Sequence, residues 1–253
     1  EKEFRPMIIE LRKFKEKGTV PFAICVERQS GYKYRYDLNV MPGKNAENEE
    51  MIERVIKSIL WVVGGFKIYL GGNDELVKAM QQVFSYEGAR KFDVEFMERV
   101  YKQKFEVVAC NYDEVPASVE ASIPAGGHLE GNRIGFDAGG SDRKVSAVVN
   151  GEVIHSEEVV WFPKINEDPE YHYQGILDSF RRAAEKMPSV DAIGVSSAGI
   201  YIDNEVRVAS LFIKVPQDKF DEKVVDMYIR AAKEYGDVPL TVANDGDVTA
   251  LAG

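Results

Sequence analysis

An aspartate followed by two glycines in the segment from Phe136 to Lys144 could bind a metal-nucleotide complex. A glycine turn lets backbone N–H groups approach a phosphate, because no Cβ stands in the way. Asp137 beside Gly139 and Gly140 would repel that phosphate unless a divalent cation lay between them, so the pattern favours a carboxylate that holds Mg²⁺ or its water. Lys144 adds a positive charge. An ordinary hairpin turn is the alternative and, for this segment alone, the simpler interpretation.

Two further segments with suitable side chains follow other strands of the same half of the chain. Asp245 could accept the proton of a hydroxyl during phosphoryl transfer while Asn244 holds a neighbouring hydroxyl. Both residues are also common at helix N-caps; for Asp247 we expect the cap, and for Asp245 both interpretations stay open. In the segment 196–199, small residues leave room for a ligand or only make a tight turn.

The elements that must position these residues follow from the hydrophobic pattern. Asn150-Gly151 predicts a type I′ hairpin turn. The predicted order is strands 133–136, 144–149 and 152–160, helix 173–186, strand 192–196, a hairpin near 203–204, helix 221–235, strand 240–243 and a helix from 247. Three antiparallel strands followed by crossover helices predict a mixed sheet of ribonuclease H type, with the three segments at strand ends of one cleft.

The first half of the chain predicts a separate, smaller α/β domain. Its pattern gives strands 22–26, 32–37, 67–70 and 105–110 and helices 49–63, 74–84 and 93–103. The stretch from Pro116 to Gly131 holds two prolines and three glycines, a composition typical of a linker. We therefore expect a domain of unknown role over residues 1–125 and a second domain over residues 131–253.

Composition and charge exclude several classes of protein. Hydrophobic residues make up 45% and charged residues 29% of the 253, as in globular proteins. The net charge is −10, and residues 131–253 hold 21 acidic but only 13 basic side chains, which argues against nucleic-acid binding. No apolar run approaches the ~20 residues that span a bilayer, and the opening residues lack a signal-peptide core. Cys25 and Cys110 are expected to be buried free thiols. We expect a cytoplasmic protein without membrane partners.

The motifs taken together resemble a known family. The strings IGFDAGGSDRKVSAVVNGEVI, AIGVSSAG and PLTVANDGDVTALAG are similar to the ROK family of sugar kinases and related repressors, within the sugar kinase, hexokinase and actin-like ATPase superfamily. The resemblance covers roughly residues 131–253. It implies a ribonuclease H-like (actin-like ATPase) N-terminal lobe that binds ATP and Mg²⁺ and phosphorylates a sugar, so the expected partners are a sugar and a nucleotide, with a homodimer left open.

The resemblance also implies a role for each matching residue. Asp137 would bind Mg²⁺ through water, and Asp245 would be the general base for the attacking hydroxyl. Asn244 would bind a sugar hydroxyl, with Ser197 and Gly199 as further substrate-binding candidates. The phosphates would be held by Gly139, Gly140, Ser141 and Lys144.

Several departures from the family pattern limit what the resemblance implies. Ser141 stands where threonine is usual, the segment 196–199 lacks the usual proline, and Gly246-Asp247-Val248 replaces a small-residue run, so the sugar stays open. The second lobe would follow Gly253, so we expect the 253 residues alone to be nearly inactive. Residues 1–125 show no helix-turn-helix, which disfavours a repressor. A non-catalytic, ligand-sensing ATPase-fold protein is the alternative function.

Overall fold

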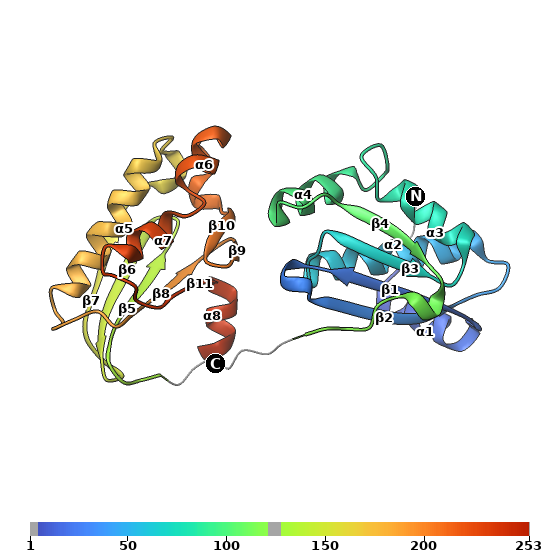
Figure 1. The fold of residues 1–253 in the computed structure, drawn as a ribbon, viewed down its shortest axis with the longest axis horizontal. Helices are drawn as coiled ribbons and strands as arrows, with labels where there is room; N and C mark the ends of the chain where they lie inside the picture. Colours follow the sequence, from blue (N-terminus) through green and yellow to red (C-terminus); the bar gives the residue numbers. More distant parts are fainter. Residues whose placement is uncertain (1–4, 121–127, 253) are drawn as a thin grey trace. The chain divides into compact units, whose positions relative to one another are not determined.

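The computed structural model describes residues 5–120 and 128–252, which form two compact α/β units (Figure 1). The first unit spans Glu1–Ile123 and the second Pro124–Gly253. Each unit has its own hydrophobic core, so each is described by itself.

The first unit is a four-stranded mixed sheet with helices packed on one face. Its elements are α1 (Met7–Lys17), β1 (Val20–Glu27), β2 (Lys33–Val40), α2 (Asn45–Val62), β3 (Lys67–Gly71), α3 (Asp74–Val83), α4 (Lys91–Tyr101) and β4 (Glu106–Cys110). The strand order is β2-β1-β3-β4, with β3 and β4 parallel and the other pairs antiparallel. The alternating residues Phe22, Ile24 and Val26 of β1 are fully buried against the helices, as period-2 patterning predicts.

The second unit has a five-stranded sheet in the order β11-β8-β5-β6-β7. Its elements are β5 (Asn132–Ala138), β6 (Asp142–Val149), β7 (Glu152–Val160), α5 (Pro169–Ala184), β8 (Ala192–Ser197), β9 (Ile200–Ile202), β10 (Glu205–Val208), α6 (Gln217–Lys223), α7 (Met227–Lys233), β11 (Leu240–Asn244) and α8 (Asp245–Ala252). Strands β5, β8 and β11 are parallel, and β6 is antiparallel to both of its neighbours. This order and direction of strands is that of a ribonuclease H-like sheet, as the sequence predicts.

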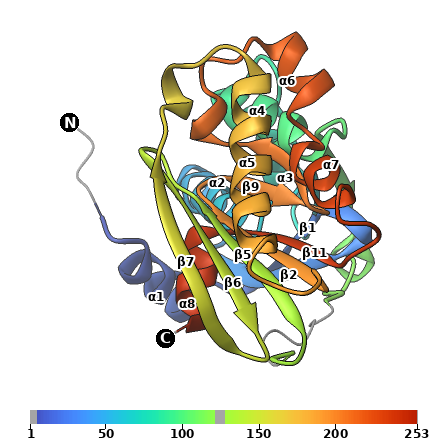
Figure 2. The same cartoon turned by 90° about the vertical axis from the view of Figure 1, so that its left-hand side faces the viewer.

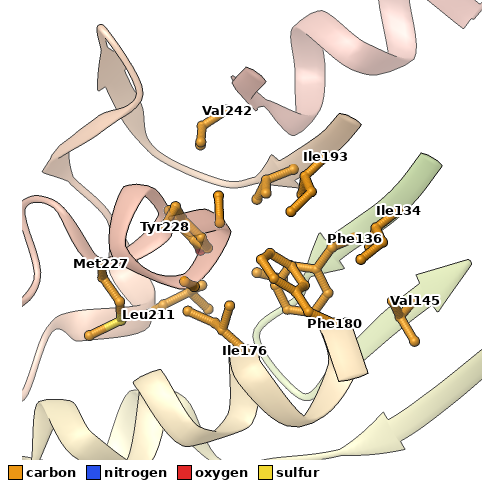
Figure 3. Packing of buried hydrophobic residues seen from close by; sticks show 14 of the residues in the cluster. Ile134, Phe136, Val145, Ile176, Phe180, Ile193, Leu211, Met227, Tyr228 and Val242 are labelled. Carbon is orange, nitrogen blue, oxygen red and sulfur yellow. The ribbon is translucent and has the colours of Figure 1, made fainter. Parts of the chain in front are cut away.

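One face of the second sheet forms the hydrophobic core of its unit. In β5, Ile134 and Phe136 alternate with residues that point to the opposite face, and in β8 Ile193 does the same. They pack against α5 and α7, which supply Phe180 and Tyr228 (Figure 3). Figure 2 shows α5 lying across the sheet in front of β5 and β6. The opposite face of β5 is therefore the one that carries Asp137.

Local turn chemistry sets the hairpins of this sheet. Asn150 and Gly151, between β6 and β7, both have positive φ angles, 48° and 84°. Two positive φ angles are the signature of a type I′ turn, so this prediction is confirmed. Asp203 and Asn204 also have positive φ angles, 53° and 64°, and they join β9 to β10 as expected.

The helix predicted over 221–235 is wrong, because the chain forms two short helices there, α6 and α7. The carbonyl oxygen of Val225 accepts a hydrogen bond from the backbone N–H of Val206 in β10, at 2.9 Å. That carbonyl is therefore used by a strand that is distant in sequence, and the helix is interrupted between Lys223 and Met227.

The N-cap predicted at Asp247 is also wrong, because α8 already begins at Asp245. The Asn244 side chain accepts the N–H of Gly246 at 2.8 Å, which is the bond that an N-cap residue makes. Helix α1, which the sequence analysis did not predict, precedes β1. Its weak amphipathic pattern buries only Phe14 fully.

The cysteines and the lengths of the helices bear on two further expectations from the sequence. Both cysteines are free thiols; Cys25 is buried, as predicted, whereas Cys110 is only half-buried. Among the helices of residues 5–120 and 128–252, none is long and apolar enough to cross a membrane.

Replacing Phe180 by alanine should destabilise the second unit by about 3–5 kcal/mol, because the buried ring leaves a cavity that the neighbours fill only in part. The ring is fully buried and packs edge-on against Phe136, with centroids 5.4 Å apart. Urea denaturation followed by Trp161 fluorescence in a Trp61→Phe background measures the loss in this unit alone. Phe162→Ala is the matched control, because that ring is 60% exposed. Equal stability of the two alanine variants would contradict the core assignment.

Candidate active site

The register of the parallel strands brings the predicted site segments to one edge of the sheet. Asp137 of β5 pairs with Ser196 of β8, which pairs with Ala243 of β11. One residue further along, Ala138, Ser197 and Asn244 form the next row of the same three strands, and Asp245 follows. Since neighbouring strands lie 4.7–4.9 Å apart, the backbones that carry the two aspartates are separated sideways by about 10 Å.

The Asp137 carboxylate is half-buried and makes no hydrogen bond or ion pair with the described residues. Its side chain lies on the sheet face opposite α5 and α7, in register with Lys144 of β6. A partly buried carboxylate without a protein partner is costly unless something else compensates its charge. Asp137 can therefore hold a cation or its water.

Trp161, directly after β7, fixes the glycine turn between β5 and β6. Its indole N–H donates to the carbonyl oxygen of Gly139 at 2.8 Å, and its backbone N–H donates to that of Ser141 at 3.1 Å. In a trans peptide the N–H points away from the C=O, so the N–H of Gly140 faces away from Trp161. Gly140 and Ser141 are exposed, and their backbone N–H groups have no acceptor among the described residues. These amides are free to bind an anion.

The other predicted phosphate ligands have partners within the chain. The Ser141 hydroxyl donates to Asp142 at 3.0 Å. The Lys144 ammonium lies 3.3 Å from Asp142 and 4.0 Å from Glu158, and its hydrogen bond with Asp142 raises the pKa of Lys144. The turn therefore offers free backbone amides, while this hydroxyl and this ammonium are already in contact with carboxylates.

Ser197 and Gly199 hold the strand ends in place. Ser197 is fully buried, and its hydroxyl donates to the carbonyl oxygen of Ala138 at 3.1 Å, which joins β8 to the end of β5. A Cβ at Gly199 would lie 2.6 Å from the backbone oxygen of Val208, too close for any other residue without a backbone shift. Ser197 and Gly199 therefore support the ends of the strands through contacts within the chain.

Asn244, the last residue of β11, and Asp245, the first residue of α8, differ in how much of their polar side chain is used. The Asn244 amide donates to the carbonyl oxygen of Gly199 at 2.8 Å, and its oxygen accepts the N–H of Gly246. Asp245 is exposed, and its Oδ1 accepts the N–H of Gly246 at 2.9 Å. Its Oδ2 has no partner in the described part of the chain, so Asp245 keeps one oxygen free to accept a proton.

Two tyrosines that the sequence analysis did not assign to the site lie near these strand ends. Burial, reinforced by the negative charge of Asp245, raises the pKa of Tyr201 to about 12. Burial also raises the pKa of Tyr228, whose hydroxyl lies close to those of Ser197 and Tyr201. Both phenols therefore stay protonated at neutral pH. Nothing in the local sequence distinguishes them from core tyrosines.

Arg143, which the sequence analysis also missed, joins β6 to α5. Its guanidinium donates to Ser179 at 3.0 Å, to Asp178 at 2.8 Å and to the carbonyl oxygen of Gly175. It follows Asp142 and is in register with Ala138, so these contacts hold the helix beside the glycine turn. The sequence analysis began this strand at residue 144, so only the longer β6 of the structure, in which Arg143 alternates with the exposed Lys144, places this arginine on the buried face.

A metal ion at this site would take few ligands from the protein. Within residues 5–120 and 128–252, no group of three or more His, Cys, Asp or Glu side chains could hold a metal. Mg²⁺ commonly uses one or two carboxylates together with water and substrate phosphates. The free carboxylate of Asp137 beside the exposed amides fits that donor set.

Comparison with known proteins finds similarity only at the level of structure. No protein-family model and no curated protein matches the sequence. Structural neighbours include putative sugar kinases, a ROK hexokinase and a ROK-family transcriptional regulator. They include a putative sugar kinase from Cytophaga hutchinsonii (18% identity, TM-score 0.38) and a ROK hexokinase from Thermus thermophilus (21%, 0.36), each covering 48% of this chain. The regulator, a homologue of the E. coli MLC protein, has 17% identity and a TM-score of 0.33, and covers 49%.

The chain spans well under half the length of these neighbours: 38% of the putative sugar kinase, 37% of the hexokinase and 30% of the regulator. Identities below a quarter of the positions leave the function to be argued from this chain's own residues.

Replacing Asp178 by asparagine should flatten the acid dependence of stability. Burial alone would raise the pKa of Asp178, but hydrogen bonds and charge from Arg143 and Arg182 lower it below its ordinary value. A carboxyl whose pKa is lowered by folding stabilises the protein above its unfolded pKa of about 3.9, and this contribution is lost as pH falls through the folded value. Urea denaturation between about pH 6 and pH 2 should show a shallower slope for Asp178→Asn than for the wild type. If stability fell with pH at the same rate in Asp178→Asn and in the wild type, the lowered pKa of Asp178 would be contradicted.

Proposed function

We propose that residues 131–253 form part of an ATP- and Mg²⁺-dependent phosphotransferase that transfers the γ-phosphoryl group to a sugar hydroxyl. The observation that carries this proposal is the common strand edge at which Asp137 and Asp245 each keep at least one carboxylate oxygen without a partner among the described residues. A half-buried carboxylate usually has a partner, so Asp137 beside exposed backbone amides, with the free oxygen of Asp245 at the same strand edge, favours a ligand site over an ordinary turn.

Each residue has a part in this proposal that matches its surroundings. The amides of Gly140 and Ser141 bind phosphate oxygens, because both residues are exposed and neither N–H has an acceptor within residues 5–120 and 128–252. Asp245 accepts the proton of the attacking hydroxyl through its free oxygen, in the manner of a general base. Asn244 retains one amide hydrogen and one lone pair for a neighbouring hydroxyl, in addition to its two bonds within the chain.

Asp137 is the residue that would hold Mg²⁺, directly or through water. When bound, the ion neutralises the charge of the phosphates that face it. Without it, the Asp137 carboxylate repels those phosphates, so the residue makes nucleotide affinity depend on the cation.

A ligand-sensing protein without catalysis is the second candidate, and the hydrogen bonds of Asn244 favour it. Both polar atoms of this amide are already used to hold Gly199 and Gly246, which leaves less capacity for a substrate. Calorimetry with ATP, Mg²⁺ and a panel of hexoses, combined with ADP measurement, separates the candidates: binding without turnover supports sensing.

Asp245→Asn should lower sugar-dependent ADP formation by about 10²–10⁴-fold, because the amide cannot accept the hydroxyl proton. A coupled ADP assay of the natural protein at full length, with a panel of hexoses, measures the effect. ATP affinity should stay within about twofold of the wild type, because Asp245 does not contact the phosphates in this proposal. Unchanged turnover of Asp245→Asn would remove the proposed base.

Asp137→Asn should weaken ATP binding by about tenfold in the presence of Mg²⁺, or about 1.4 kcal/mol. In EDTA the same variant should bind ATP as well as the wild type or better, because the substitution removes a repulsive charge. Calorimetry of the 253-residue chain under both conditions measures the two affinities. An equal loss of affinity with and without Mg²⁺ would argue against a cation at Asp137.

A further inference from the structure

The segment that follows β7 is attached to the glycine turn and carries a lysine that no motif singles out. Trp161 makes hydrogen bonds to both Gly139 and Ser141, on either side of Gly140. Lys164 comes three residues later, and its Cε and Nζ lie 2.7 Å from the position that a Cβ on Gly140 would occupy. The end of this side chain therefore rests against the central residue of the turn.

The backbone that carries Lys164 is anchored on the other side by α5. The His172 ring, fully buried, places its Nε2 3.0 Å from the carbonyl oxygen of Pro163. The hydroxyl of Tyr171 accepts the backbone N–H of Phe162 at 2.8 Å, and the Asn166 amide donates to the Phe162 carbonyl oxygen at 2.6 Å. Because Trp161 is bonded to the turn and Pro163 to α5, the backbone that carries the Lys164 side chain is held in place.

Within the part of the chain that the structure describes, Lys164 has no carboxylate partner. Its ammonium forms no ion pair and no hydrogen bond with the described residues. The carboxylate nearest in sequence to the turn, Asp142, is already in contact with Ser141 and Lys144. A free ammonium beside exposed amides of Gly140 and Ser141 combines the two kinds of donor that bind phosphate in proteins.

We infer that Lys164, together with the Gly140 and Ser141 amides, forms the subsite for the polyphosphate group of the nucleotide. This rests on the nucleotide binding proposed above and extends it by assigning the cation. Lys164 supplies the positive charge at the turn. Lys144 points to the sheet face of Asp137, where Asp142 and Glu158 compensate its charge.

The probe for this subsite is inorganic tripolyphosphate, which carries the phosphate chemistry without the nucleoside or the sugar. Titrated into the 253-residue chain, it should shift the amide ¹H–¹⁵N signals of Gly140 and Ser141, and Lys164→Gln should weaken its binding by about tenfold. Lys186→Gln, which removes the same charge beyond the far end of α5, is the matched control and should change affinity by less than about twofold. The variant Lys144→Gln, titrated in the same way, tests whether Lys144 contributes to tripolyphosphate binding.

Each outcome decides for or against the subsite. A loss confined to Lys164→Gln, with shifts at Gly140 and Ser141, supports it. Equal losses in Lys164→Gln and Lys186→Gln, a loss confined to Lys144→Gln, or no tripolyphosphate binding by the wild type overturns it. Failure of the proposed reaction is distinguishable, because a protein that binds tripolyphosphate through Lys164 but forms no ADP keeps the subsite and loses only the phosphoryl transfer.

Discussion

Parallel pairing of β5, β8 and β11 is the constraint on which the candidate site depends. Hydrogen bonding in register fixes which residues stand at the same level of the sheet, so Asp137 is level with Ser196 and Asn244 with Ser197. Because the three strands run in one direction, their carboxyl ends share an edge, where ligands commonly bind in α/β sheets. A shift of one residue in either pair would turn the site residues to the other face.

The same alternation that buries one face of the sheet leaves the other available. Phe136 and its buried neighbours pack against α5 and α7, and this burial holds the strands rigidly. On the opposite face of β5 and β8, Gly135, Gly194 and Ser196 are small, so no bulky side chain from these strands crowds Asp137. The alternation of side chains along the strands therefore produces both the hydrophobic core on one face of the sheet and the candidate site on the other.

The glycine turn shows how tertiary contacts can make an anion-binding site from a common sequence. Gly139-Gly140-Ser141 is compatible with an ordinary hairpin turn, in which carbonyl and N–H groups point in many directions. Trp161 selects one conformation of this turn. Its indole N–H and backbone N–H donate to the carbonyl oxygens of Gly139 and Ser141, and this turns the N–H of Gly140 outward. The shape of the turn is therefore set by Trp161, which lies directly after β7 and about twenty residues further along the chain.

The sequence by itself determined what local pattern encodes: the succession of strands along the second half of the chain, the type I′ turn at Asn150-Gly151, and the positions of Asp137 and Asp245 at strand ends. It did not determine hydrogen bonds between segments that are distant in the chain. The bond from Val206 to Val225 divides the helix predicted over 221–235, and the contact between Lys164 and Gly140 brings in a lysine that no motif contains. Periodicity reports which face of an element is buried, whereas the partner of each polar group depends on where other segments come to lie.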